Sequence, residues 1–195
     1  MDSKSVWKTS LIESAQTLSK FVDQQGTLEK CTAFSDLLVR TYLQGGTAFI
    51  CGNGGSHCDA LHFAEELTGK YRKERRPLAA MALGEATHVT CVGNDYGFAE
   101  IFSRGLQAFG KKGDLLIALS TRGNSEHVIR AVSVAKSTGI STVGLLGRDG
   151  GKLRELVDLA LIVPATTSDR IQEVHMTVLH TVIEVVERQL FPENY

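Results

Sequence analysis

The sequence lacks the features of secreted, membrane and nucleic-acid-binding proteins. The first residues, MDSKSVWKTSLIES, include no apolar leader segment, and no stretch approaches the roughly 18 apolar residues that a membrane span needs. The formal net charge of −1 leaves no general basic excess to neutralise phosphates, which argues against nucleic acid as a partner. The basic run from Lys70 to Arg76 is short and contains Glu74, so we interpret it as a solvated surface connection.

Cysteine pairs and repeats are also missing. The four cysteines form no CxxC pair, and we interpret them as reduced thiols: Cys31, Cys51, Cys58 and Cys91. No internal repeat, low-complexity tract or linker divides the 195 residues, of which 43% are hydrophobic and 22% charged. These absences predict a cytoplasmic protein made of one domain, residues 1–195.

The apolar pattern predicts an α/β fold. Helical spacing covers 5–22 and 28–44, before the first strand. Five short apolar segments predict strands, at 47–51, 78–83, 114–119, 142–146 and 159–163, and we expect the second of them to be buried. Helical segments follow at 85–109, broken by a loop at 93–97, at 126–137, near 152–156 and at 169–190. The alternation predicts an open, five-stranded parallel sheet flanked by helices, a flavodoxin-like sandwich with two N-terminal helices.

A glycine-rich turn, CGNGGSHCDALHFAEELTG, joins the first strand to a helix at Cys51–Gly69. Gly52, Gly54 and Gly55 allow a ligand close to the backbone, and Ser56 is the expected N-cap. A second polar turn, STRGNS, follows the third strand at Ser120–Ser125. Its hydroxyl and amide groups favour a phosphate monoester, which Arg122 would either contact or point away from. Because ligands bind at the carboxyl ends of parallel strands, we expect both turns to line one pocket.

His62 and Glu66 are four residues apart and therefore share one face of the helix that follows the glycine turn. An imidazole and a carboxylate in this arrangement suit a metal site or an acid/base pair. The adjacent Glu65 faces about 100° away, so we expect it to be a solvated or salt-bridged neighbour.

The last helix carries three polar side chains among apolar ones, Gln172, His175 and His180. Gln172 and His180 are separated by about 12 Å of helix rise, too far for one chain to bring both to a single metal ion. If both serve one site, two subunits must build it.

Five motifs, in order, carry a resemblance over nearly the whole chain: the glycine turn with its helix, VGNDYGF at 92–98, STRGNS, GRDGGK at 147–152 and DRIQEVHMTVLH at 169–180. Together they resemble the phosphoheptose isomerases of the sugar-isomerase (SIS) domain family. Members commonly have STSGNS, whereas this chain has Arg122 in place of the second serine.

The resemblance implies a homotetramer with sites at subunit interfaces and one Zn²⁺ per subunit. It implies interconversion of sedoheptulose 7-phosphate and D-glycero-D-manno-heptose 7-phosphate for lipopolysaccharide core synthesis. The implied zinc ligands are His62, Glu66, Gln172 and His180. The implied catalytic groups are Glu66 and His180. The implied substrate contacts are Asn53, Gly54, Gly55, Glu66, Asn94, Asp95, Ser120, Thr121, Ser125 and Gln172, to which we add Arg122.

The expected reaction moves a proton between C1 and C2 through an enediol, with Glu66 acting on carbon, His180 on oxygen and zinc polarising the carbonyl. A second hypothesis is a non-catalytic SIS-domain protein that binds the bacterial replication initiator. Arg122 and the ending LFPENY resemble that class, but the pair His62 and Glu66 does not.

Overall fold

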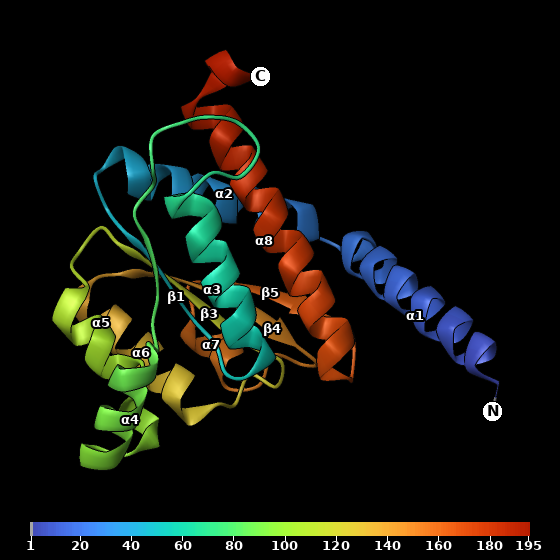
Figure 1. Cartoon of the computed structure of the whole chain (residues 1–195), viewed down its shortest axis with the longest axis horizontal. Helices are drawn as coiled ribbons and strands as arrows, with labels where there is room; N and C mark the ends of the chain where they lie inside the picture. Colours follow the sequence, from blue (N-terminus) through green and yellow to red (C-terminus); the bar gives the residue numbers. More distant parts are fainter. Residues whose placement is uncertain (1) are drawn as a thin grey trace.

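The computed structural model describes residues 2–195 as an α/β sandwich (Figure 1). Its five strands are all parallel, in the order β2-β1-β3-β4-β5. The elements in chain order are α1 (Ser3–Asp23), α2 (Thr27–Leu43), β1 (Ala48–Cys51), α3 (Gly55–Thr68), β2 (Ala80–Ala82), α4 (Ala86–Asp95), α5 (Ser103–Phe109), β3 (Leu115–Ser120), α6 (Glu126–Thr138), β4 (Ser141–Gly147), α7 (Leu153–Leu156), β5 (Leu159–Val163) and α8 (Ser168–Leu190), with 3₁₀ turns at Phe98–Glu100 and Pro192–Asn194. The predicted fold class is confirmed.

The sheet separates two hydrophobic cores. Successive residues of β1 point to opposite faces, so Ile50 packs in the core under α2, α3 and α8, while Phe49 packs in the core under α5 and α6. All six residues of β3 are buried, as expected for a central strand of a sheet covered on both faces. This arrangement places α3 and α8 side by side on one face (Figure 1).

Two predictions about local structure were wrong. The predicted buried strand at 78–83 is the three-residue edge strand β2, where Met81 is 39% exposed because β1 is its only neighbour in the sheet. The predicted loop at 93–97 begins late, since Gly93, Asn94 and Asp95 complete the last turn of α4. The amide of Tyr96 still bonds to the carbonyl of Val92, and the chain turns only at Gly97, where φ is +89°.

The N-cap of α3 also differs from the prediction. The helix begins after Gly54, whose φ of +58° is a conformation that suits glycine, and Ser56 lies inside the first turn. Ser56 is 3% exposed, and its side chain faces α8 instead of capping α3.

The N-terminal helix α1 extends away from the body of the molecule (Figure 1). Several of its apolar side chains are exposed to solvent, with exposed fractions of 47% for Val6, 69% for Trp7, 62% for Leu11 and 45% for Ile12. Within residues 2–195, no helix combines the length and apolar character required to cross a membrane.

Candidate active site

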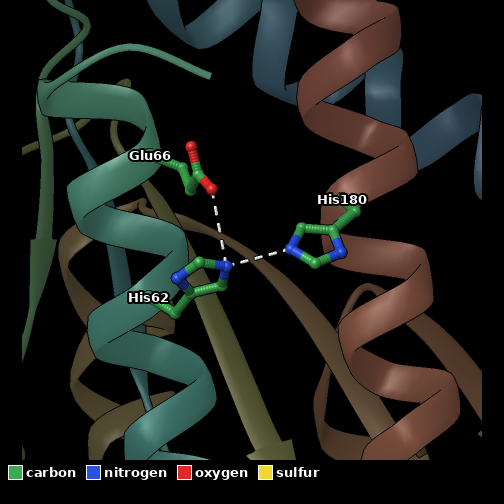
Figure 2. Close-up of side chains that lie close together, drawn as sticks. All are labelled: His62, Glu66 and His180. Atoms are coloured by element: carbon green, nitrogen blue, oxygen red, sulfur yellow. Dashed lines mark hydrogen bonds and ion pairs between the residues drawn. The ribbon is translucent and has the colours of Figure 1, made fainter. Parts of the chain in front are cut away.

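Three polar side chains meet between α3 and α8 (Figure 2). The Nε2 atoms of His62 and His180 lie 3.0 Å apart, and Glu66 Oε1 lies 3.5 Å from His62 Nε2. Each residue offers one ligand atom, and these atoms all lie within 4.8 Å of one another. The sequence prediction that His62 and Glu66 share a helix face, and that His180 joins them from the last helix, agrees with this geometry.

The chemistry of these three groups fits a bound cation. A carboxylate has only acceptor lone pairs, and each neutral imidazole has one acceptor nitrogen. The convergence of Glu66 Oε1 and two Nε2 atoms therefore concentrates lone pairs, which a proton or a metal ion must satisfy. Imidazole and carboxylate are ligands that suit zinc, which in catalytic sites commonly has three protein ligands and one open position.

Glu65, which we expected to be a solvated or salt-bridged neighbour, is exposed and contacts His62. The Glu65 Oε1 atom lies 2.9 Å from His62 Nδ1, while the Glu65 side chain is 63% exposed. His62 thus contacts a different glutamate through each of its ring nitrogens.

The connection after α3 is not simply a solvated loop. Arg75 is buried, where its Nε donates to Glu187 Oε1 at 2.8 Å and its other nitrogens donate to the carbonyls of Glu66 and Leu67 at the end of α3. The same connection carries Tyr71, whose ring stacks on His180 with centroids 5.9 Å apart. Arg75 therefore joins α3, α8 and the segment that covers His180, a role that its position within a charged run conceals.

The two polar turns line one cavity, as predicted. Its volume is about 320 Å³, and it is lined by Asn53, Ser56, Leu119, Ser120, Thr121, Arg122, Ser125, Ser168 and Gln172. Ser120 Oγ lies 3.3 Å from Ser125 Oγ and accepts a hydrogen bond from the amide of Gly123. We refer to this set of lining residues as the polar cradle. Ser168, at the start of α8, was missed by the sequence analysis, although a serine at a helix start after a strand is a recognisable signal.

The polar cradle and the metal-ligand group lie along the same pair of helices. Gln172 Nε2 of α8 donates to Ser56 Oγ of α3 at 3.2 Å, at the cradle end. Gly55 leaves room for this contact, since a Cβ there would lie 2.8 Å from Gln172 Nε2. His62 is six residues after Ser56 and His180 is eight after Gln172, which places the ligand group about 9–12 Å farther along the helices.

Not every predicted site residue lies in this cavity. Asn94 and Asp95 are exposed at the end of α4, where Asn94 Nδ2 donates to Asp95 Oδ1, and α4 lies away from α8 in Figure 1. His175 is buried against the sheet, with Nε2 3.2 Å from the carbonyl oxygen of Leu146. Burial lowers the pKa of His175 to about 4, which is expected of a neutral structural imidazole.

Asp59 was not predicted to be a site residue. It lies on α3, three residues before His62, and its Oδ2 atom is buried without a hydrogen-bond partner among residues 2–195. Burial raises the pKa of Asp59 to about 6, an effect that the positive charge of protonated His62 opposes. Only folding creates this environment, so no sequence pattern marks it.

Comparison with known proteins assigns the family. A family model described as SIS domain matches residues 11–147. The chain is 51% identical to a phosphoheptose isomerase of Fusobacterium nucleatum, over 95% of this chain and 97% of that protein. It is 42% identical to a phosphoheptose isomerase of Vibrio vulnificus, over 94% of this chain and 96% of that one.

Solved structures agree with the sequence comparison. The fold matches a phosphoheptose isomerase of Francisella tularensis with a TM-score of 0.91 and 30% identity, covering 96% of this chain and 100% of that one. It matches the enzyme of Neisseria gonorrhoeae with a TM-score of 0.88 and 34% identity, covering 94% and 98%. The chain therefore belongs to the phosphoheptose isomerases of the SIS domain family.

Proposed function

We propose that this chain interconverts sedoheptulose 7-phosphate and D-glycero-D-manno-heptose 7-phosphate, and that it acts as a single domain in synthesis of the lipopolysaccharide core. The observation that carries the proposal is the close group of His62, Glu66 and His180 on the same two helices as the polar cradle. The group supplies acid, base and ligand chemistry, and the cradle supplies hydroxyls for a phosphate.

The separation of the two parts suits a seven-carbon substrate. With carbon–carbon bonds of about 1.5 Å, an extended seven-carbon sugar phosphate is roughly 10 Å long. The cradle and the metal-ligand group are separated by a similar length of helix, about 9–12 Å. A phosphate held at Ser120, Thr121, Arg122 and Ser125 would therefore leave C1 and C2 near Glu66.

Glu66 is the proposed base that carries a proton between C1 and C2, and His180 the proposed acid and base at the two oxygens. Glu66 Oε1 faces His62, so we assign proton transfer at carbon to the second carboxylate oxygen, Oε2. Tyr71 stacks on His180 and holds its ring toward His62. Zinc, held by His62, Glu66 and His180 of one chain together with Gln172 of another subunit, would polarise the substrate carbonyl and stabilise negative charge on oxygen.

The remaining substrate contacts are assigned by family resemblance and position. Asn53 belongs to the cradle, Gly54 and Gly55 follow it in the same turn, and Gln172 reaches Ser56. Within one chain, Asn94 and Asp95 lie away from the metal-ligand group, so we assign their substrate contacts to the site of another subunit.

We propose a homotetramer in the cytoplasm. The exposed apolar side chains of α1 and a mostly apolar cavity of about 440 Å³ between α1, α2 and α8 offer surface for a second copy. The four cysteines are all free thiols, which a reducing compartment keeps stable.

The test is incubation of purified protein with sedoheptulose 7-phosphate, followed by separation of the aldose and ketose phosphates. We expect aldose to form, turnover to fall after chelation, and added Zn²⁺ to restore it. No aldose at any zinc concentration would refute the isomerase, whereas full turnover by demonstrably metal-free protein would refute the role of zinc alone.

The non-catalytic alternative, a protein that binds the replication initiator, is not favoured. The related proteins compared above are named as isomerases, and the imidazole and carboxylate groups that catalysis needs are assembled.

A further inference from the structure

We propose that Glu65 is a positioning residue that fixes the proton of His62 on Nδ1 and so directs the Nε2 lone pair into the site. The proposal rests on the proposed function, because it concerns how His62 is prepared to bind a metal ion. Glu65 itself faces solvent and does not belong to the metal-ligand group.

The two ring nitrogens of His62 face two successive glutamates. Glu65 Oε1 lies 2.9 Å from Nδ1, a hydrogen-bond distance, whereas Glu66 Oε1 lies 3.5 Å from Nε2. The i,i+3 and i,i+4 spacings bring both carboxylates to the same imidazole. The two adjacent glutamates therefore contact opposite sides of the His62 ring, Glu65 at Nδ1 and Glu66 at Nε2.

A carboxylate can only accept a hydrogen bond, so the contact at Nδ1 requires a proton on that nitrogen. In the neutral ring, Nε2 then carries the lone pair, and it faces Glu66 and His180. Without Glu65 the proton is free to occupy Nε2, where it would block the ligand atom. A hydrogen-bonded carboxylate on the far nitrogen also makes an imidazole more basic and holds its plane.

Because Glu65 is exposed, a role in positioning His62 can be distinguished from a role in folding. A surface pair of this kind contributes little to folding, so its removal should leave the fold intact. Loss of the second contact of a metal-bound histidine, by comparison, typically lowers metal affinity 10–100-fold. A role in folding and a role in positioning His62 therefore predict different results for a variant that lacks the Glu65 carboxylate.

The first test is the tautomer of His62 in metal-free protein, measured from ¹⁵N chemical shifts of labelled histidine and assigned by loss of the signal in His62→Gln. We expect the Nδ1–H form in the wild type, a shift toward Nε2–H in Glu65→Ala, and partial retention in Glu65→Gln, whose amide oxygen still accepts. Glu74→Ala, at an exposed glutamate on the connection after α3, is the matched control. An unchanged tautomer in Glu65→Ala would overturn the proposal.

The second test is the Zn²⁺ dissociation constant, measured by competition with a chelator, with circular dichroism to verify the fold. We expect Glu65→Ala to bind zinc 10–100-fold more weakly than the wild type and Glu74→Ala to bind it equally well. Equal affinity in Glu65→Ala would contradict the proposal. If the wild type binds no zinc, the metal in the proposed function fails, while the tautomer measurement still decides the role of Glu65.

Discussion

Gln172 and His180 lie two turns apart on α8 and contact different residues of α3, Ser56 and His62 respectively. Of these two residues, a single chain therefore brings only His180 to the metal-ligand group. A fourth ligand from Gln172 would have to come from another subunit, as the spacing in the sequence predicted.

This geometry predicts complementation between inactive variants. If Glu66 of one subunit and Gln172 of another form one site, mixed oligomers of Glu66→Gln and Gln172→Ala contain some sites with both residues intact. Co-refolding equal amounts should restore roughly one quarter of wild-type activity. The matched controls are each variant refolded alone. No recovery in verified mixed oligomers, or full activity in a monomeric form, would contradict a shared site.

Replacing Arg122 by serine tests its contact with the substrate phosphate. Arg122 lines the polar cradle, and loss of one charge-assisted hydrogen bond costs about 1.5 kcal/mol or more. We expect Arg122→Ser to raise KM about tenfold with little change in kcat. An unchanged KM would show that the side chain points away from the phosphate.

Arg75→Met should destabilise the protein strongly. The substitution leaves the buried Glu187 carboxylate without its cation, at a cost of about 3–5 kcal/mol. Thermal unfolding should shift down by roughly 10 °C, and Lys73→Met, on the same connection but exposed, should shift it by far less. The double variant Arg75→Met/Glu187→Gln should recover part of the loss. Equal thermal unfolding midpoints for Arg75→Met and the wild type would contradict a structural role for the pair of Arg75 and Glu187.

The buried His175 is expected to make the folded protein less stable in acid. Its pKa is lowered from 6.5 to about 4 in the folded protein, so below pH 6.5 the unfolded chain binds a proton that the folded chain does not. The stabilisation is present above pH 6.5 and is lost as the pH falls toward 4. Between pH 7 and pH 5 the loss should be about 2 kcal/mol.

Urea unfolding at both pH values checks this expectation. The free energy of unfolding of the wild type should fall by about 2 kcal/mol more than that of His175→Leu over this interval. Parallel pH profiles for the two proteins would show that His175 titrates normally.

Much of the fold and the site followed from local patterns in the sequence. Apolar runs placed all five strands, and the spacing of His62 and Glu66 anticipated the pair to which the structure adds His180. These features depend on periodicity and on residue chemistry, both of which a single sequence displays.

The features that were missed depend on tertiary contacts. Arg75 looks like one cation in a charged run until α8 supplies Glu187, and Asp59 acquires its raised pKa only when α3 packs. The N-cap of α3 is Gly54 and not Ser56, whose hydroxyl accepts a hydrogen bond from Gln172 of α8. Such partners are remote in sequence, so no local pattern indicates them.

The role of Glu66 is tested most directly by the rate at which Glu66→Gln converts sedoheptulose 7-phosphate into the aldose 7-phosphate. The amide keeps the shape of the side chain but cannot carry the proton, and general base catalysis contributes about 10²–10⁴-fold. We predict a loss of at least 100-fold with an unchanged circular dichroism spectrum, while Glu74→Gln retains the wild-type rate. A Glu66→Gln protein that isomerises the sugar at the wild-type rate would contradict the account.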